Sequence, residues 1–540
     1  MFRRVVIALA LAVLVFFVDS SSSLPLPWIS NVFGSHMVLQ QAPARAVLFG
    51  WSNATSSVVK VSLLHTVNNS VAEQHVVTPD WSDAGRWVVR LRPRSAVAGR
   101  PIQSFTVIVS AAGVVRASLT DVLFGEVWLC AGQSNMVFPL AFDFNATAEF
   151  AAADQRAPQL RFIDLGTQWE NVVDAPAHVI NKQSIPWTRA TAAMLNDSNT
   201  NDWPGLSAVC YEFARRLLER LDVPIGVVDS SWGGTIIQAW MPADGINACP
   251  AVDAAVLPAS PTNPANNYSA LFNGMILPFV GGDGTAPMVF QGVVWDQAEQ
   301  NGILADNSGG PGLYGCLFRS LISSWRTLLG EVSFHFVQVP GTTNYYQNGD
   351  PDGFYPSLRL EQASVLENST LVCMASAVDA GDWFSPFGSV HPRLKEPVAQ
   401  RLFQCAMAIT YLDKSVPFAG PQVIKAVHSA NSTVSVHFAN VGTGLVADYA
   451  NSTEHETFCP VDRLCVNCCA FFDVELGLGG NWAAVSLTDV QISSPTTLSI
   501  AVPRGLRATR VRYLYGDWPI AVLYNSFLLP MTPFVVSVRE

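Results

Sequence analysis

The fold is decided by the stretch from Val127 to Met136, which reads Val-Trp-Leu-Cys-Ala-Gly-Gln-Ser-Asn-Met. Its first residues form a short apolar run with the length of a buried strand. Gly132 follows the run, and Ser134 stands two residues later before a polar side chain. A serine at such a strand-to-helix turn exposes its hydroxyl and lies where backbone N–H groups can stabilise an oxyanion. Ser134 is therefore a candidate nucleophile, although serine is also a common helix N-cap.

Four more apolar runs continue this pattern between about residues 121 and 413: Ile225–Val228, Val289–Trp295, Ser333–Val339 and Leu371–Ala377. Between them, apolar residues recur at helical spacing over 210–221 and 313–328, and Gly330 provides a C-terminal stop for the second helix. Alternating strands and helices predict a five-stranded, mostly parallel sheet covered on both faces. Ligands of such sheets lie beyond the carboxyl ends of the strands, so the segments after the strands are the candidate site.

Glycines and side-chain amides follow the second and third strands. Gly233 and Gly234 come after the second strand, and their bare N–H groups can approach a ligand closely. The third strand is followed by the amides of Gln297 and Asn301 and by the carboxylate of Glu299. These residues are candidates for holding an oxyanion together with the backbone N–H of the nucleophile.

A histidine follows the fifth strand. Asp379 and Asp382 precede His391, which lies just before another helix. The turns together supply a nucleophile, backbone donors, amides and a base, which are the groups that ester hydrolysis requires. We expect Ser134 to attack and His391 to act as general base. Asp382 or Asp379 is favoured over Glu299 as the acid that orients His391, because both aspartates lie on the loop that leads to it.

Short apolar runs separated by turns flank this region on both sides. They predict a β-sandwich-like module over residues 24–120 and a second over residues 414–540 around a catalytic domain at 121–413. No catalytic constellation stands out in the first module, which favours a supporting role for it.

The first 23 residues have the pattern of a cleaved signal peptide. Arg3 and Arg4 precede the apolar run Val5–Val18, which is short for a bilayer span, and the alternative is an uncleaved anchor. Eight Asn-x-Ser/Thr sequons agree with entry into the secretory pathway. Their asparagines are Asn53, Asn68, Asn145, Asn196, Asn267, Asn368, Asn431 and Asn451. We expect a secreted or lysosomal protein without a membrane anchor after signal cleavage.

The net charge and the cysteine content further limit the classes of protein that this sequence fits. The net charge is −11, from 31 basic and 42 acidic residues, so the basic footprint of a nucleic-acid-binding protein is absent. Ten cysteines fit an oxidising compartment. The cluster of Cys459, Cys465, Cys468 and Cys469 could bind zinc, but its spacing lacks paired C-x2-C knuckles, and disulfides within the C-terminal module are favoured. Cys468 and Cys469 are not expected to bond to each other.

Taken together, the motifs resemble those of the sialate O-acetylesterases, in the SGNH/GDSL hydrolase superfamily. The resemblance covers nearly the whole mature chain. Its blocks are Gly34–Gln40, Gly132–Met136, Pro224–Gly226, Ser231–Trp240, Trp295–Asn301, Ser385–Pro392, Leu523–Asn525 and Pro533–Phe534. The resemblance implies a flavodoxin-like catalytic domain that releases acetate from O-acetylated sialic acids without a metal or cofactor.

The chain departs from the family pattern in three places, one of which is the position two residues before Trp240, where this chain carries Gln238. Asp296 and Ala298 replace the Tyr and Gly of the usual Trp-Tyr-Gln-Gly-Glu block. The superfamily's Asp-x-x-His is absent, because Gly388 stands three residues before His391, so a backbone carbonyl could also orient the histidine. Two alternative functions remain open: an esterase acting on another acetylated polysaccharide such as xylan, and an inactive glycan-binding protein.

Overall fold

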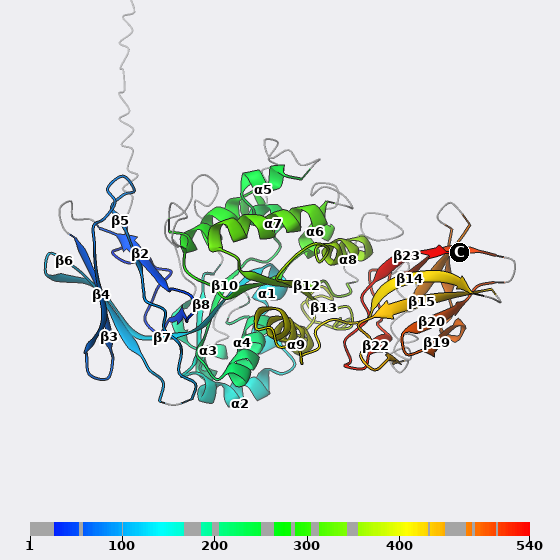
Figure 1. Ribbon diagram of the computed structural model, residues 1–540, viewed down its shortest axis with the longest axis horizontal. Helices are drawn as coiled ribbons and strands as arrows, with labels where there is room; N and C mark the ends of the chain where they lie inside the picture. Colours follow the sequence, from blue (N-terminus) through cyan, green and yellow to red (C-terminus); the bar gives the residue numbers. More distant parts are fainter. Residues whose placement is uncertain are drawn as a thin grey trace, which may run out of the picture.

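The structure is a computed structural model. It describes residues 26–52, 58–99, 101–166, 185–196, 203, 205–249, 264–281, 287–303, 313–342, 355–429, 432–448, 471–477, 481–503 and 506–540. Figure 1 shows a central layer of strands with helices on both faces, placed between a β-rich region at the N-terminal end and another at the C-terminal end. The expected α/β hydrolase with β-rich flanks is confirmed at this level.

The central sheet has the strand order β13-β12-β11-β7-β10-β8-β9. All neighbours pair in parallel except β8 and β9, which are antiparallel. Each of the five expected strands lies in this sheet. The strands are β7 (Val114–Gly132), β8 (Leu160–Asp164), β9 (Ile185–Arg189), β10 (Ile225–Ser231), β11 (Gly292–Asp296), β12 (Ser333–Gln338) and β13 (Val372–Ser376).

The expected number of five parallel strands is wrong by one, because β8 is a sixth. This strand lacks a continuous apolar run, since Arg161 is its second residue and Asp164 its last. The guanidinium of Arg161 is nevertheless buried, because it donates to Asp121 at 2.7 Å and to the Pro158 carbonyl at 2.8 Å. Without β8 and β9, the order β10-β7-β11-β12-β13 is the flavodoxin-like order 2-1-3-4-5, which reverses direction beside β7.

Helices cover both faces of the sheet, with α5, α7 and α8 on one side and α2, α4 and α9 on the other (Figure 1). Successive residues of β7 point to opposite faces. Trp128 packs in the core on the α4 side, and Leu129 packs in the core on the α7 side. Both expected helices are confirmed, and Gly330 ends α7 at a φ of 88°. The helices are α1 (Ser134–Val137), α2 (Ala146–Arg156), α3 (Ala192–Leu195), α4 (Ala208–Leu221), α5 (Ala243–Asn247), α6 (Glu299–Ile303), α7 (Tyr314–Leu329), α8 (Tyr355–Ser364) and α9 (Glu396–Cys405).

The N-terminal β region is continuous with the central sheet through β7. The first half of β7 pairs antiparallel with β6, and its second half pairs with β10 and β11. The expected module boundary at residue 120 therefore lies inside a strand. The other strands of this region are β1 (Val38–Gln40), β2 (Val47–Trp51), β3 (Val59–His65), β4 (Val71–Val77), β5 (Arg86–Arg90) and β6 (Phe105–Ala111).

The C-terminal β region contains an eight-stranded sheet in the order β18-β17-β21-β23-β14-β15-β20-β19 and a separate pair, β16-β22. Its strands share one apolar core that includes Val436, Val511 and Phe534. The strands are β14 (Gln422–Ser429), β15 (Thr433–Ala439), β16 (Leu445–Ala447), β17 (Phe472–Leu476), β18 (Trp482–Val485), β19 (Val490–Ser494), β20 (Thr497–Ala501), β21 (Ala508–Tyr513), β22 (Leu523–Asn525) and β23 (Phe534–Arg539).

Three disulfides tie the central region together: Cys130–Cys210, Cys249–Cys316 and Cys373–Cys405. The first joins β7 to α4, and the third joins β13 to α9, so each fastens a strand to a covering helix. The expected signal peptide and the cluster of Cys459, Cys465, Cys468 and Cys469 lie outside the described residues. Within the described ranges, no helix combines the length and apolar character that a bilayer crossing needs.

Candidate active site

Ser134 and His391 meet at the carboxyl ends of the central strands. Ser134 is the first residue of α1, directly after β7, where the strand order reverses. His391 lies on the segment that follows β13. The distance between His391 Nε2 and Ser134 Oγ is 2.8 Å. Two residues that are 257 positions apart in the sequence therefore lie within hydrogen-bond distance of each other, which is the geometry that a nucleophile and its base require.

The second nitrogen of His391 fixes the tautomer of the ring. Nδ1 lies 2.8 Å from the carbonyl oxygen of Phe387. Because a carbonyl oxygen can only accept, Nδ1 carries the proton and donates it, and in the neutral ring Nε2 is then the acceptor. The unprotonated Nε2 faces the Ser134 hydroxyl, which is the arrangement that a general base requires.

The surroundings of His391 favour its neutral form. The pKa of His391 is lowered to about 4, chiefly by burial and also by the positive charge of Lys395, against the opposing effect of the hydrogen bond to Phe387. The ring of Trp203 lies edge-to-face with the imidazole, with centroids 4.7 Å apart. His391 is therefore neutral, and able to accept a proton, over the whole range above moderately acidic pH.

Neither aspartate of the preceding loop contacts His391. Both ring nitrogens are already occupied by Ser134 and the Phe387 carbonyl. Arg393 holds the Asp382 carboxylate in two hydrogen bonds of 2.6 and 3.1 Å. Arg401 holds the Asp379 carboxylate in two more, of 2.6 and 2.7 Å. The preference for Asp382 or Asp379 as the orienting acid is thus corrected, because an arginine draws each carboxylate away and a backbone carbonyl takes its place.

Glu299, the third candidate acid, is also engaged elsewhere. Its side chain is 1% exposed, and its Oε1 accepts a hydrogen bond of 2.5 Å from the Asn135 amide. Its Oε2 accepts another from the backbone N–H of Ala298 at 3.2 Å. Glu299 therefore contacts Asn135, the residue after Ser134, and does not contact the imidazole of His391.

Gly233 and Gly234 lie on the turn after β10, which passes beside Ser134. A Cβ placed on Gly233 would stand 3.3 Å from the Cβ of Ser134, so the backbone passes closely by the serine at this point. Gly234 has a φ of 69°, in the left-handed region that glycine adopts without steric cost. The turn after β10 can therefore bring backbone N–H groups near the Ser134 hydroxyl.

Gln297 and Asn301 have a different role from the one expected. Gln297 is completely buried, and its Nε2 donates to the Thr235 carbonyl at 2.9 Å and to Asn301 Oδ1 at 2.8 Å. Asn301 Nδ2 donates to Gln238 Oε1 at 3.1 Å. These amides brace the turn after β10 against the turn after β11. The expectation that Gln297 or Asn301 holds the oxyanion is corrected, because their N–H groups face internal acceptors.

Gln300 is a side-chain amide that the sequence reasoning did not single out. It is half-buried, and its Oε1 would be the nearest neighbour, at 3.9 Å, of a Cβ on Gly234. Its backbone N–H donates to Gln133 Oε1 at 3.1 Å. Trp203 was also missed, because a lone tryptophan in a polar stretch carries no motif.

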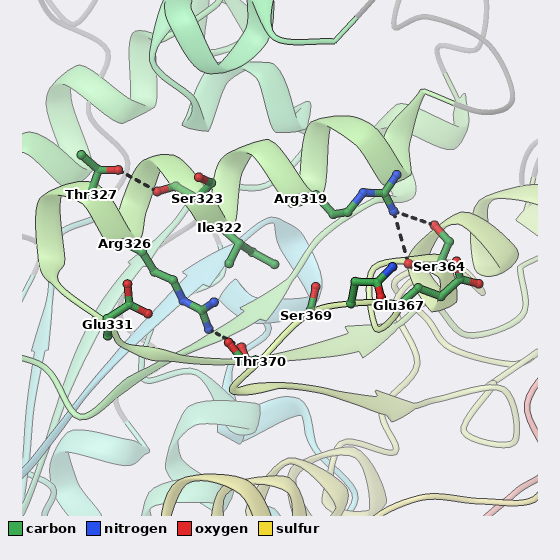
Figure 2. A pocket seen from close by; sticks show the side chains of 11 residues that line it. Arg319, Ile322, Ser323, Arg326, Thr327, Glu331, Ser364, Glu367, Ser369 and Thr370 are labelled. Atoms are coloured by element: carbon green, nitrogen blue, oxygen red, sulfur yellow. Dashed lines mark hydrogen bonds between the residues drawn. The ribbon is translucent and has the colours of Figure 1, made fainter.

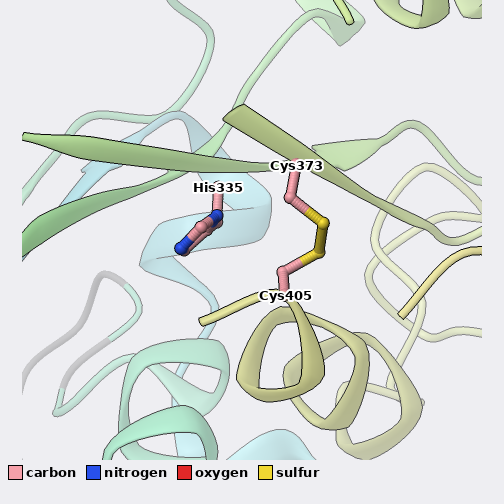
Figure 3. Close-up of side chains that lie close together, drawn as sticks. All are labelled: His335, Cys373 and Cys405. Carbon is pink, nitrogen blue, oxygen red and sulfur yellow. A yellow bond between two sulfur atoms is a disulfide. The ribbon is translucent and has the colours of Figure 1, made fainter. Parts of the chain in front are cut away.

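Two other features of the structure are separate from this pair. Figure 3 shows His335 beside Cys373 and Cys405, a grouping with metal-ligand residue types. The two sulfurs are joined in a disulfide, so they are not thiolate ligands. Figure 2 shows side chains from α7 and from residues 364–370 that line a groove. The volume of this groove is about 710 Å³. None of its lining residues belongs to the Ser134–His391 pair.

Comparisons with known proteins converge on one enzyme class. The family described as "Carbohydrate esterase, sialic acid-specific acetylesterase" matches residues 125–377. The sialate O-acetylesterases of Pongo abelii and Homo sapiens are each 29% identical to this chain, over 98% of it and 95% of their own length. The crystal structure of a carbohydrate acetylesterase from Xanthomonas citri superposes with a TM-score of 0.74 at 25% identity, over 94% of this chain and 99% of that chain.

Proposed function

We propose that this chain is a serine esterase of the sialate O-acetylesterase family, which releases acetate from O-acetylated sialic acids. The observation that carries the proposal is the 2.8 Å contact between Ser134 Oγ and the unprotonated Nε2 of His391. A serine hydroxyl is a poor nucleophile unless a base removes its proton during attack. The contact supplies that base in the correct tautomer.

In the first half of the reaction, Ser134 Oγ attacks the acetyl carbonyl carbon while His391 Nε2 takes the hydroxyl proton. The backbone N–H groups of Ser134 and of Gly233 or Gly234 stabilise the negative oxygen that forms. We assign the third donor to Gln300, since the amides of Gln297 and Asn301 face inward. The C–O bond to the sugar then breaks, and His391 returns the proton to the departing sugar oxygen, which leaves acetyl-Ser134.

In the second half, water attacks the acetyl-serine carbonyl and gives its proton to His391. The Ser134 Oγ–carbon bond breaks, His391 returns the proton to the serine oxygen, and acetate leaves. The Phe387 carbonyl accepts the Nδ1–H hydrogen bond throughout, and stabilises the imidazolium that forms in each half. The cycle needs no metal and no cofactor.

The second candidate is an esterase for another acetylated polysaccharide. It is favoured by the likeness to the Xanthomonas citri enzyme, whose description is a carbohydrate acetylesterase without a named sialic acid. Acetate release from O-acetylated sialosides and from acetylxylan, measured side by side on the purified protein, separates the two. Release from sialosides supports our proposal, release from xylan alone supports the second candidate, and release from neither indicates an inactive glycan-binding protein.

Asp382→Asn and Asp379→Asn are each expected to keep kcat for acetate release within about tenfold of wild type. Each carboxylate is held by an arginine, and the Phe387 carbonyl already orients His391. An acid that oriented the histidine would cost about 10⁴-fold in kcat when replaced by its amide. A loss of that size in either folded variant would contradict the dyad and restore a carboxylate triad.

The acid limb of kcat/KM is expected to have its midpoint near pH 4. Only neutral His391 can accept the serine proton, so activity is present above the pKa of the free enzyme's histidine and is lost as the pH falls through it. Burial places that pKa at about 4. Acetate release measured from neutral to strongly acidic pH checks the midpoint, and a midpoint near the ordinary histidine value of about 6.5 would contradict this account.

We also propose the division expected from the sequence, with a catalytic domain at 121–413 between modules at 24–120 and 414–540. The placement of Ser134 and His391 within 121–413 supports it.

Entry into the secretory pathway, with a secreted or lysosomal destination, is supported by the three disulfides. The exposed sequon asparagines Asn68, Asn196 and Asn368 agree with it. Peptide mapping of the mature protein for glycans and for its N-terminal residue tests this destination.

A further inference from the structure

A series of buried, hydrogen-bonded side chains lies next to Ser134 and His391. Lys395 Nζ donates to Asn135 Oδ1 at 2.6 Å. Asn135 Nδ2 donates to Glu299 Oε1 at 2.5 Å and to the Val390 carbonyl at 3.0 Å. Lys395 and Asn135 are each 2% exposed and Glu299 is 1% exposed. Lysine is rarely buried to this degree without a defined partner, so this series of hydrogen bonds around Lys395 needs a structural explanation.

The orientation of the Asn135 amide follows from its neighbours. An ammonium group can only donate, and an ionised carboxylate can only accept. The amide oxygen must therefore face Lys395, and the amide nitrogen must face Glu299 and the Val390 carbonyl. Reversing the amide would place donor against donor and acceptor against acceptor at the same time. The two charged groups thus lock Asn135 in one orientation.

The locked amide connects the two halves of the active site. Asn135 directly follows Ser134, and Val390 directly precedes His391. The hydrogen bond from Asn135 Nδ2 to the Val390 carbonyl therefore joins the segment of the nucleophile, after β7, to the segment of the base, after β13. The backbone N–H of Lys395 donates to Asp143 at 2.9 Å, which anchors the lysine at the start of α9.

The charges around Lys395 come from several elements. Asp296 lies at the end of β11, Glu299 begins α6, Asp143 follows α1, and Asp382 lies on the loop before His391. Burial lowers the pKa of Lys395 to about 8, against the attraction of these carboxylates. Burial and the charge of Glu299 raise the pKa of Asp296 to about 8. The cation of Lys395 also acts on His391, whose pKa it lowers.

We propose that Lys395 is a positioning residue for the Ser134–His391 pair, acting through the Asn135 amide that it locks between Glu299 and the Val390 carbonyl. The proposal rests on the proposed function, since it assigns the pair to ester hydrolysis. Its consequence is that loss of the ammonium loosens the spacing between the serine and the imidazole. A misplacement of about 1 Å at reacting groups can cost about 10²-fold in rate.

Lys395→Met keeps an unbranched side chain that is one atom shorter, and it removes the charge and the hydrogen bond of the ammonium group. We expect kcat to fall about 10²-fold with KM changed less than about threefold, because the contacts to substrate remain. The acid limb is expected to move up from about 4 toward the ordinary histidine value, since a positive neighbour has been removed. Lys395→Arg, which keeps the charge, should retain the low acid limb, and Lys425→Met on β14 is the matched control for an exposed lysine.

Lys395→Met leaves Glu299 without its cationic partner, which could prevent folding. The double variant Lys395→Met/Glu299→Gln removes both charges and, if the proposal is correct, shows the same low kcat and an upward shift of the acid limb. The pKa of His391, followed by NMR titration, reports the shift without any substrate. Thermal unfolding of each variant separates positioning from stability.

Folded variants that keep wild-type kcat, and whose His391 titrates near 4 as in the wild type, would overturn the proposal. A change in KM alone would do the same. These rates are measured with p-nitrophenyl acetate, which needs only the Ser134–His391 chemistry. Failure of the wild type on O-acetylated sialosides alone would count against the proposed substrate, whereas the response to Lys395→Met on the simple ester would still decide the positioning role.

Discussion

Ser134→Ala is expected to lower kcat for acetate release by about 10⁴- to 10⁶-fold. The substitution removes the atom that forms the covalent acetyl intermediate, and losses of this size follow removal of the nucleophile in serine hydrolases. The folded state should hardly change, because Ser134 is only half-buried and its hydroxyl contacts the His391 ring. Acetate release and thermal unfolding, measured together, check both statements.

Ser429→Ala is the matched control for Ser134→Ala. Ser429 lies on the exposed end of β14, in the C-terminal β region, and its hydroxyl is paired with Ser435. We expect this control to keep wild-type kcat. A Ser134→Ala protein that is folded and keeps more than about a hundredth of the wild-type rate would contradict the assignment of the nucleophile.

His391→Ala is expected to lower kcat nearly as far, because the Ser134 hydroxyl then has no base to accept its proton. The residual rate should lose its dependence on a group that titrates near 4. The substitution also leaves a space of the size of the missing ring next to Trp203 and Ser134. Free imidazole added to the buffer should therefore restore part of the rate in proportion to its concentration.

His428→Ala provides the control for the loss of a histidine far from the site. His428 lies on β14, where its ring accepts a hydrogen bond from Arg507 at 3.3 Å. Its removal should change neither kcat nor the pH profile, with or without imidazole. If His391→Ala kept near-normal activity, or if imidazole failed to increase its rate, another group would have to serve as the base.

The sequence predicted the parts of the fold that depend on hydrophobic patterning. Continuous apolar runs marked five of the six parallel strands, and stripes at helical spacing marked α4 and α7. The sixth parallel strand, β8, was not predicted from the sequence, because its buried Arg161 is stabilised by Asp121, a partner from another part of the chain. A polar residue that is buried only through a tertiary ion pair carries no local signal of burial.

Ser134 and His391 could be predicted because each follows a strand of a parallel sheet, where strand ends converge. The roles of Gln297 and Asn301 could not be predicted in this way. Both residues lie near the expected place, but their side-chain N–H groups point away from the expected oxyanion. That direction depends on the Thr235 carbonyl and on Gln238, which belong to another strand end. Hydrogen-bond partners across a fold are not visible in the sequence.

The orienting group for His391 illustrates the same limit. Asp379 and Asp382 were favoured by their nearness in the sequence, and Arg401 and Arg393 reverse that preference in the structure. The group that takes their place, the Phe387 carbonyl, has no side-chain identity and so leaves no mark in a motif. One sequence feature agreed with an orienting carbonyl. Gly388 stands three residues before His391, where the superfamily pattern has an aspartate.

The most direct test of the central claim is to trap the covalent intermediate. The protein is mixed with an O-acetylated sialoside, quenched in acid during the first turnovers, digested and analysed by mass spectrometry. We predict one acetyl group on the peptide that contains Ser134, formed as fast as acetate is later released, and none in Ser134→Ala. Wild-type acetate release without any acetylation of Ser134, or undiminished release by Ser134→Ala, would contradict the account.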